Sequence, residues 1–171
     1  PGGMLTYGIP SYKLEKDVID AEIDIMREMG VEIKCGVEVG KDITIDQLRA
    51  NGYKAFYVAI GCQGGKKPNV VGSDAEGVTT AVDFLKVANC GCYAVEGKTI
   101  VVGGGNVAID AARVSVRSGA KEVAMYCLET RDIMPASNEE IVEAQEDGVA
   151  INCGWGPKEV VVENGKAVAV V

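Results

Sequence analysis

The segment KTIVVGGGNVAIDAARVSVRSGAKEVAMYCLETR, residues 98–131, restricts the possible folds of this chain more than any other part of it. An apolar run leads into three glycines, and a helix-like stretch and a second apolar run follow them. Six consecutive residues fit the pattern G-x-G-x-x-A, namely Gly103, Gly104, Gly105, Asn106, Val107 and Ala108. Because this pattern joins a strand to a helix in dinucleotide-binding units, the sequence predicts an α/β, Rossmann-like fold.

The small residues of this pattern each have a separate physical reason. Gly103 permits the tight turn off the strand, and Gly105 lacks the Cβ that would keep a pyrophosphate away from the backbone. Ala108 allows the helix to pack closely against the strand. The amides that open the helix, near Asn106 and Val107, point at the phosphates with the helix dipole behind them. The alternative is a tight strand–helix turn that binds no ligand.

The residue that ends the second strand of such a unit faces the adenosine ribose, and Glu129 holds that place. A carboxylate accepts hydrogen bonds from the ribose hydroxyls and repels a 2′-phosphate, so Glu129 favours NAD(H) over NADP(H). Arg131 follows closely and could neutralise a 2′-phosphate, which leaves NADP(H) possible. The alternatives are a solvated carboxylate at Glu129 and a surface charge at Arg131. Glu122 is nearer the usual spacing from the glycines, but it precedes the strand and so lies at the wrong end.

A long stretch of chain precedes the glycine turn, and apolar periodicity divides it into short elements. Pro1–Leu14 is rich in glycine and proline and predicts a loop, and the helix after it should end at Gly30. Asp42 or Thr44 could cap a further short helix. The expected strands lie at 31–35, 37–39 and 55–60, the last buried on both faces, and the expected later helices at 45–50 and 79–89.

The glycine turn opens a regular alternation of strands and helices. The expected strands lie at 99–102, 122–128 and 149–153, and the expected helices at 106–118 and 138–147. Residues 157–171 predict a hairpin with Asn164-Gly165 at its turn.

Composition excludes several classes of function. The 171 residues include no histidine, which excludes Ser–His and Cys–His catalysis and histidine-bound metals. A net charge of −8 argues against a nucleic-acid surface, because phosphate binding needs clustered Lys and Arg. No apolar run approaches the roughly 20 residues that cross a bilayer. We therefore expect a cytoplasmic protein that binds neither nucleic acid nor membrane.

The remaining reactive side chains predict no catalytic or metal site. Of six cysteines only Cys90 and Cys92 lie close together, whereas a zinc or iron–sulfur site needs about four thiolates in a tight constellation. We expect reduced, mostly buried thiols, with Cys62 as a packing residue and metal binding or oxidation at Cys90–Cys92 as the weaker alternative. Arg113 and Arg117 lie on the predicted helix and are expected to be solvated, although Arg113 could face the cofactor.

Four ordered motifs carry a resemblance to a known family: GGMLTYGIPSYKL, YVAIGCQGGKKPNVVGSDAEGV, IVVGGGNVAIDAAR and RDIMPAS. In this order they resemble the glutamate synthase small (β) subunit family, and the flavoprotein half of dihydropyrimidine dehydrogenase shares the layout. In that family an NAD(P)-binding domain is inserted into an FAD-binding domain. The resemblance covers nearly the whole chain.

The resemblance implies a division of the chain and a place for Gly61. Residues 1–78 would be a partial FAD-binding domain, and residues 79–171 an NAD(P)-binding domain that is incomplete at its C-terminus. Gly61 ends the strand at which the family's chain passes the flavin. The family's FAD fingerprint would lie before Pro1, so we expect an internal part of a longer polypeptide. NADPH-binding members usually place an arginine pair near the position of Glu129.

The implied function is hydride transfer between NAD(P)H and FAD in a flavin-dependent oxidoreductase. The cofactors carry this chemistry, so no side chain need act as acid or base. The implied partners are a nicotinamide dinucleotide and, for the parent enzyme, a glutamate synthase large subunit or an iron–sulfur electron-transfer protein. The alternative is a sensor or scaffold module that binds NAD(H) without turnover.

Overall fold

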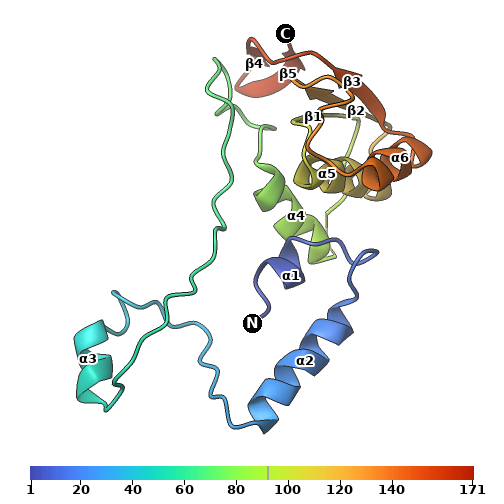
Figure 1. Ribbon diagram of the computed structural model, residues 1–171. Helices are drawn as coiled ribbons and strands as arrows, with labels where there is room; N and C mark the ends of the chain where they lie inside the picture. Colours follow the sequence, from blue (N-terminus) through green and yellow to red (C-terminus); the bar gives the residue numbers. More distant parts are fainter. Residues whose placement is uncertain (92) are drawn as a thin grey trace.

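The computed structural model describes residues 1–91 and 93–171, so Cys92 of the cysteine pair lies outside the described residues. Three parallel strands form the main sheet in the order β1-β2-β3 (Figure 1). The glycine turn joins the first strand to the first helix of an alternating series: β1 (Lys98–Val102), α5 (Asn106–Arg117), β2 (Glu122–Cys127), α6 (Asn138–Glu146) and β3 (Ala150–Cys153). The predicted α/β alternation is confirmed within a residue or two at each boundary.

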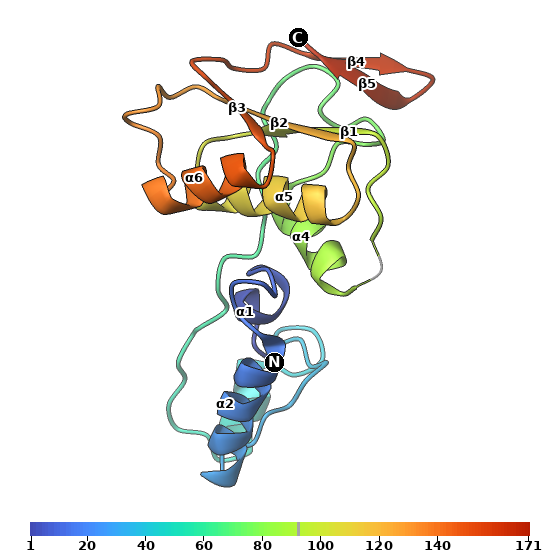
Figure 2. The same ribbon diagram turned by 90° about the vertical axis from the view of Figure 1, so that its right-hand side faces the viewer.

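The core of the molecule lies between this sheet and the two helices that connect its strands. Figure 2 shows α5 and α6 side by side along one face of the sheet. Alternate residues of β2 are buried, as expected of a strand with one face on the core, and α5 turns a stripe of small and aliphatic side chains toward them. Ile109, Met125 and Ile141 are fully buried at the centre. Burial of an aliphatic side chain of this size contributes about 1.5–3 kcal/mol.

A hairpin of β4 (Val160–Glu163) and β5 (Lys166–Val170) lies on the side of the sheet away from α5 and α6 (Figure 2). Asn164 and Gly165 form its turn with φ of 51° and 82°, both in the left-handed region that a two-residue hairpin turn requires. This prediction is confirmed. Residues 70–77 are held to the hairpin, since the Val160 amide donates to the Val71 carbonyl at 2.8 Å.

The N-terminal residues contain more helix than the sequence predicts. A single turn, α1 (Met4–Tyr7), forms inside the predicted loop, so the assignment of Pro1–Leu14 to loop is wrong in part. The helix α2 (Lys16–Glu28) stops just before Gly30, which agrees with the predicted end within two residues. Gly30 has φ 92°, and its amide donates to the Arg27 carbonyl, which is the usual left-handed helix end. The helix α4 (Ala81–Asn89) follows Thr80, whose side chain caps it.

Residues 31–69 lead away from the sheet to α3 (Ile45–Ala50) and return (Figure 1). Thr44, of the two predicted caps, forms a capping box with Gln47. The strands predicted at 31–35, 37–39 and 55–60 are absent from the described residues, and these predictions are wrong. Tyr57 is 94% exposed. A strand needs a neighbour for its hydrogen bonds, and no described strand lies beside 55–60.

Candidate dinucleotide-binding site

The glycine turn adopts the conformation that the sequence pattern predicts. Gly103 has φ 137°, which L side chains rarely adopt, and its amide donates to the Tyr126 carbonyl at 2.9 Å. A Cβ on Gly103 would lie 3.5 Å from the Cβ of Ala108, which itself is buried against the strand. Gly103 therefore makes the turn, and the small side chain of Ala108 lets α5 start immediately behind it.

Gly104 is the most tightly enclosed residue of the turn. A Cβ on Gly104 would lie 3.0 Å from the Cys127 Cβ, 3.1 Å from a Glu129 carboxylate oxygen and 3.2 Å from the Met134 Cγ. The sequence pattern treats this position as unrestricted, so sequence reasoning missed the packing role of Gly104. The signal was not in the motif, because the atoms that fill the space come from the end of β2 and the loop behind it.

Gly105 differs from Gly103 and Gly104 because the space on the side of its missing Cβ is open. No heavy atom lies within 4 Å of the position that its Cβ would take. Its φ of −94° and ψ of 171° are open to any residue, so the backbone does not require glycine there. The open space lies against the start of α5, where a ligand backbone could approach.

The first amides of α5 have no partner in the described part of the chain. The first helical hydrogen bond runs from the Ala108 amide to the Gly105 carbonyl at 2.9 Å. The amides of Asn106 and Val107 donate to no described backbone acceptor, and no side chain caps the helix. Together with the helix dipole, such free amides favour an anion such as a phosphate.

The loop after β2 is bound directly to the glycine turn. The Ala136 amide donates to the Gly104 carbonyl at 3.0 Å, and the Ser137 amide donates to the Asn106 side-chain oxygen at 3.0 Å. The side chain of Asn106 is therefore occupied within the protein, whereas its amide is free. Sequence reasoning placed Asn106 in the site but did not find this contact, which joins α5 to the cap of α6.

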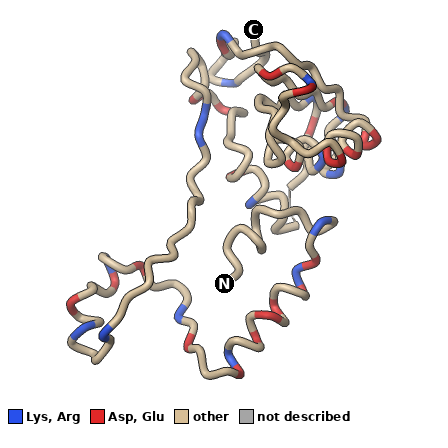
Figure 3. Tube along the Cα trace, in the orientation of Figure 1, with Lys and Arg blue, Asp and Glu red and all other residues tan. Residues whose placement is uncertain are grey.

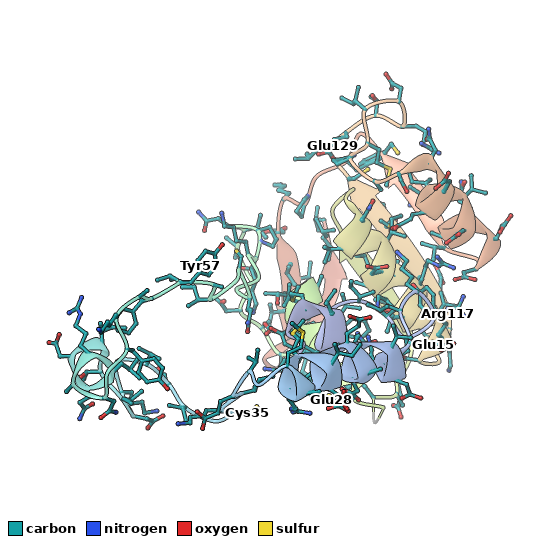
Figure 4. All side chains as sticks on the ribbon, turned by 60° about the horizontal axis from the view of Figure 1, so that its bottom comes forward. Glu15, Glu28, Cys35, Tyr57, Arg117 and Glu129 are labelled. Atoms are coloured by element: carbon teal, nitrogen blue, oxygen red, sulfur yellow. The ribbon has the colours of Figure 1, made fainter. Side chains whose placement is uncertain are left out.

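The structure brings Glu129 to the turn and directs Arg131 elsewhere. Glu129 is half-buried, and its carboxylate lies against Gly104 at the end of β2 (Figure 4). Arg131 is exposed, and its guanidinium donates to the Asn138 side-chain oxygen at 3.1 Å, at the start of α6. Glu122 begins β2 at the opposite end and pairs with Lys98 at 2.6 Å. Of the two carboxylates, only Glu129 lies at the glycine turn.

Gly61 is not gathered into this cluster. It has φ 71° and lies in the extended part of residues 31–69, where a Cβ would approach only Gln63, at 3.9 Å. Its expected role beside a flavin stays a prediction. Cys62 and Cys90 are exposed, so the expectation of packing at Cys62 is wrong in this structure. No group of described His, Cys, Asp and Glu residues could hold a metal ion.

The expectation that Arg113 is solvated is wrong. Arg113 is 6% exposed, and its guanidinium binds Asp147 at 2.7 Å and also pairs with Glu143, away from the glycine turn. Arg117 is about half-exposed and binds Asp147 at 2.9 Å. Carboxylates of α6 and its C-cap therefore pair with the buried Arg113 and with the partly exposed Arg117.

Sequence comparison confirms the resemblance to glutamate synthase small subunits. No protein-family model matches the chain. It is 37% identical over 183 residues to the glutamate synthase [NADPH] small chain of Escherichia coli K12, which covers 99% of this chain and 38% of the relative. It is 40% identical over 168 residues to the NADP(+)-dependent formate dehydrogenase subunit beta of Moorella thermoacetica, covering 96% of this chain and 24% of the relative. The NAD-dependent dihydropyrimidine dehydrogenase subunit PreT of Escherichia coli K12 is 40% identical over 169 residues, 97% of this chain and 40% of the relative.

Comparison with solved structures confirms the fold. Mycobacterium tuberculosis FprA in complex with NADPH matches with a TM-score of 0.74 and 16% identity, over 98% of this chain and 53% of that protein. The chain thus spans well under two thirds of the length of each of these proteins. The relatives' names include both NAD and NADP, so they do not decide between the two nucleotides. Among the described residues, no helix has the length and apolar character needed to cross a membrane.

Proposed function

We propose that residues 79–171 bind the nicotinamide dinucleotide in a flavin-dependent oxidoreductase of the glutamate synthase small-subunit type. The observation that carries the proposal is the open space at Gly105, next to free amides of Asn106 and Val107. Residues with these properties fit a pyrophosphate: a missing Cβ permits close approach, and the amides supply donors. A bound NAD(P)H would supply a hydride, and the protein's part is to hold and orient it.

We further propose NAD(H) as the preferred nucleotide, with NADP(H) possible. Glu129 supports this preference, because its carboxylate lies at the turn where the adenosine ribose of such units binds. Its oxygens can accept hydrogen bonds from the ribose hydroxyls and would repel a 2′-phosphate. Arg131, the candidate reader of a 2′-phosphate, is held by Asn138.

Residues 1–78 are proposed to lie on the flavin side of the enzyme. The sequence of residues 1–78 has no G-x-G-x-x-G or G-x-G-x-x-A pattern, and residues 55–60 are exposed. We expect that they do not bind a flavin by themselves, and no step of the mechanism is assigned to them. By analogy with the relatives, which are subunits of larger enzymes, the proposed partner is a glutamate synthase large subunit or an iron–sulfur electron-transfer protein.

The test is a titration of the full-length protein with NADH and with NADPH. We expect NADH to bind more tightly, and Glu129→Ala to narrow the difference by about 1.5–3 kcal/mol, the value of a hydrogen bond to a charged group. Glu122→Ala is the matched control, because it removes a carboxylate from the opposite end of the same strand. Tighter binding of NADPH that is lost in Arg131→Ala would show that the arginine reads the nucleotide and that Glu129 does not.

A second measurement separates an enzyme from a sensor. Anaerobic mixing of the flavin-loaded, full-length protein with NADH should bleach the flavin absorbance. Nucleotide binding without bleaching would favour the sensor or scaffold function. The names of the three relatives reported above, which are dehydrogenase or synthase subunits, support the enzyme.

A further inference from the structure

The N-terminal loop at residues 9–14 lies on the helices of the glycine-turn unit, far from it in sequence. The Lys13 ammonium binds Asp110 on α5 at 2.5 Å and Glu140 on α6 at 2.8 Å. The three side chains are partly buried, with 22%, 13% and 22% of their surfaces exposed. In Figure 3, acidic and basic residues lie beside one another where α5 and α6 run together. One lysine thus joins two helices to a third segment of chain.

Tyr12 adds a second contact to the same surface. Its ring lies under two guanidinium groups, with the Arg113 Cζ 4.7 Å and the Arg117 Cζ 4.4 Å from the ring centroid. Burial raises the pKa of Tyr12 to about 12, so the ring stays neutral and keeps the character that a cation–π contact needs. Because Arg113 and Arg117 are themselves fixed by Asp147, the ring meets a rigid surface.

The other end of the loop is also tied down. The Asn89 side chain, at the end of α4, donates to the Tyr7 carbonyl at 2.8 Å. The Lys16 ammonium donates to the Ile9 carbonyl at 2.6 Å and so closes the loop at residues 9–14, which has little freedom. Burial opposes charge on Lys13, but Asp110 and Glu140 outweigh it and raise the pKa of Lys13. Lys13 therefore keeps the positive charge on which both ion pairs depend.

Both carboxylates that bind Lys13 lie near the starts of their helices, and both helix starts contact the glycine turn. Asp110 follows Asn106 by one turn of α5, and Glu140 lies in the first turn of α6 after its cap, Ser137. Ser137 and Asn106 are hydrogen-bonded to each other at 3.0 Å. A displacement of Lys13 would therefore be transmitted to the glycine turn through the first turns of α5 and α6.

We propose that Lys13 is a positioning residue, which holds residues 9–14 on the starts of α5 and α6 so that the N-terminal segment and the glycine turn move as one body. The proposal rests on the proposed function in one respect, since the turn must hold the nucleotide for the positioning to affect hydride transfer. Lys13 does not touch the nucleotide in this account. It fixes the position of the N-terminal segment, which we assign to the flavin side, relative to the nucleotide at the start of α5.

The first test does not depend on any cofactor. Hydrogen exchange of the full-length protein follows the amides of Lys13 and Leu14, which donate to the Pro10 carbonyl at 3.0 and 3.1 Å. Lys13→Met should speed their exchange about tenfold or more, because loops without tertiary contacts open readily. The control is Lys34→Met, which removes the same charge from an exposed 3.2 Å pair with Glu32 and should change nothing at these amides. Unchanged exchange in Lys13→Met would overturn the proposal.

The second test separates positioning from folding and from binding. In stopped-flow reduction of the flavin by NADH, Lys13→Met should lower the rate about fivefold or more while NADH affinity stays within about twofold, the signature of lost orientation. Lys13→Arg keeps the charge and should restore most of the rate. Tyr12→Leu should act like Lys13→Met, and Tyr12→Phe, which keeps the ring, like the native protein.

The outcomes of the two tests are distinguishable from failure of the proposed function. If the native protein binds neither nucleotide, the proposed function fails, and hydrogen exchange alone still tests whether Lys13 holds the loop. If Lys13→Met loosens the loop but leaves the reduction rate unchanged, Lys13 is structural and not a positioning residue. An equal loss of affinity and rate, without rescue by arginine, would also contradict the proposal.

Discussion

Alanine at Gly105 should weaken nucleotide binding, whereas alanine at Gly104 should lower stability, because the Cβ position is open at the first glycine and crowded at the second. A Cβ at Gly105 meets no atom within 4 Å, and its backbone angles suit any residue. Losing glycine there restricts the unfolded chain and contributes about 0.4–1 kcal/mol of stability. Alanine is a poorer helix N-cap than glycine, which costs about 0.5–1 kcal/mol. The two terms offset each other, so Gly105→Ala should fold with nearly native stability.

The same methyl group should interfere with a bound dinucleotide. It would occupy the open side of the turn, where we propose that the pyrophosphate approaches the backbone. A displacement of the phosphate from the amides of Asn106 and Val107 removes at least one charge-assisted hydrogen bond. At about 1.5–3 kcal/mol for such a bond, NADH affinity should fall about tenfold or more.

Gly104→Ala is the counterpart, and its effect should fall on stability. Its Cβ would lie 3.0 Å from the Cβ of Cys127, which is buried and cannot move aside freely. Overpacking of this kind costs about 1–3 kcal/mol. The assays are thermal or denaturant unfolding and NADH titration of the same two variants. The reasoning is refuted if Gly105→Ala binds NADH as well as the native protein, or if it is the less stable of the two.

Three further outcomes follow from charge, burial and exposure. Burial alone would raise the pKa of Asp147, but Arg113 and Arg117 hold that pKa below its ordinary 3.8. The ionised carboxylate therefore stabilises the folded protein above pH 3.8, and this stabilisation is lost as the pH falls below that value. Asp147→Asn should therefore lower the free energy of unfolding by about 1–3 kcal/mol at neutral pH and by less in acid. Denaturant titrations that show the same loss of stability at neutral and acid pH would contradict this. Burial, with a contribution from Cys153, raises the pKa of Cys127 to about 11, so a thiol reagent should modify Cys35, Cys62 and Cys90 first, as peptide mass spectrometry would check. The chain alone should purify without flavin absorbance, and one flavin per chain would show that residues 1–78 form a flavin site unaided.

The elements after Thr79 could be predicted from sequence because their signals are local. The glycine turn, the alternation of β2 and the Asn164-Gly165 hairpin each depend on residues a few positions apart. The same holds for the left-handed helix end at Gly30. Glu129 could also be placed beside the turn, because the end of the second strand is defined by the unit itself.

The failures are segments whose structure depends on distant chain. Residues 55–60 are apolar enough for a buried strand, but apolar sequence does not supply the neighbouring strand that would pair with them. Gly104 was predicted only as part of the glycine turn, and its tight packing was not foreseen because the atoms that enclose it lie at the end of β2 and in the loop that follows. In both cases the structure depends on chain that is distant in sequence, namely a neighbouring strand for residues 55–60 and the atoms around Gly104, and a local pattern does not contain this information.

The misassigned face of α5 shows why a charged stripe is an ambiguous signal. Asp110, Arg113 and Arg117 follow helical spacing and so share one side of α5, and the two arginines of this side were expected to be solvated. A stripe of mixed charge is equally what an ionic interface requires, provided that opposite charges face it. Here Lys13 faces the aspartate and the α6 carboxylates face the arginines. Helix α5 therefore has two sides that contact the rest of the protein, one apolar against the sheet and one ionic against α6 and the N-terminal loop, and substitutions on either side should disturb the glycine turn that begins the helix.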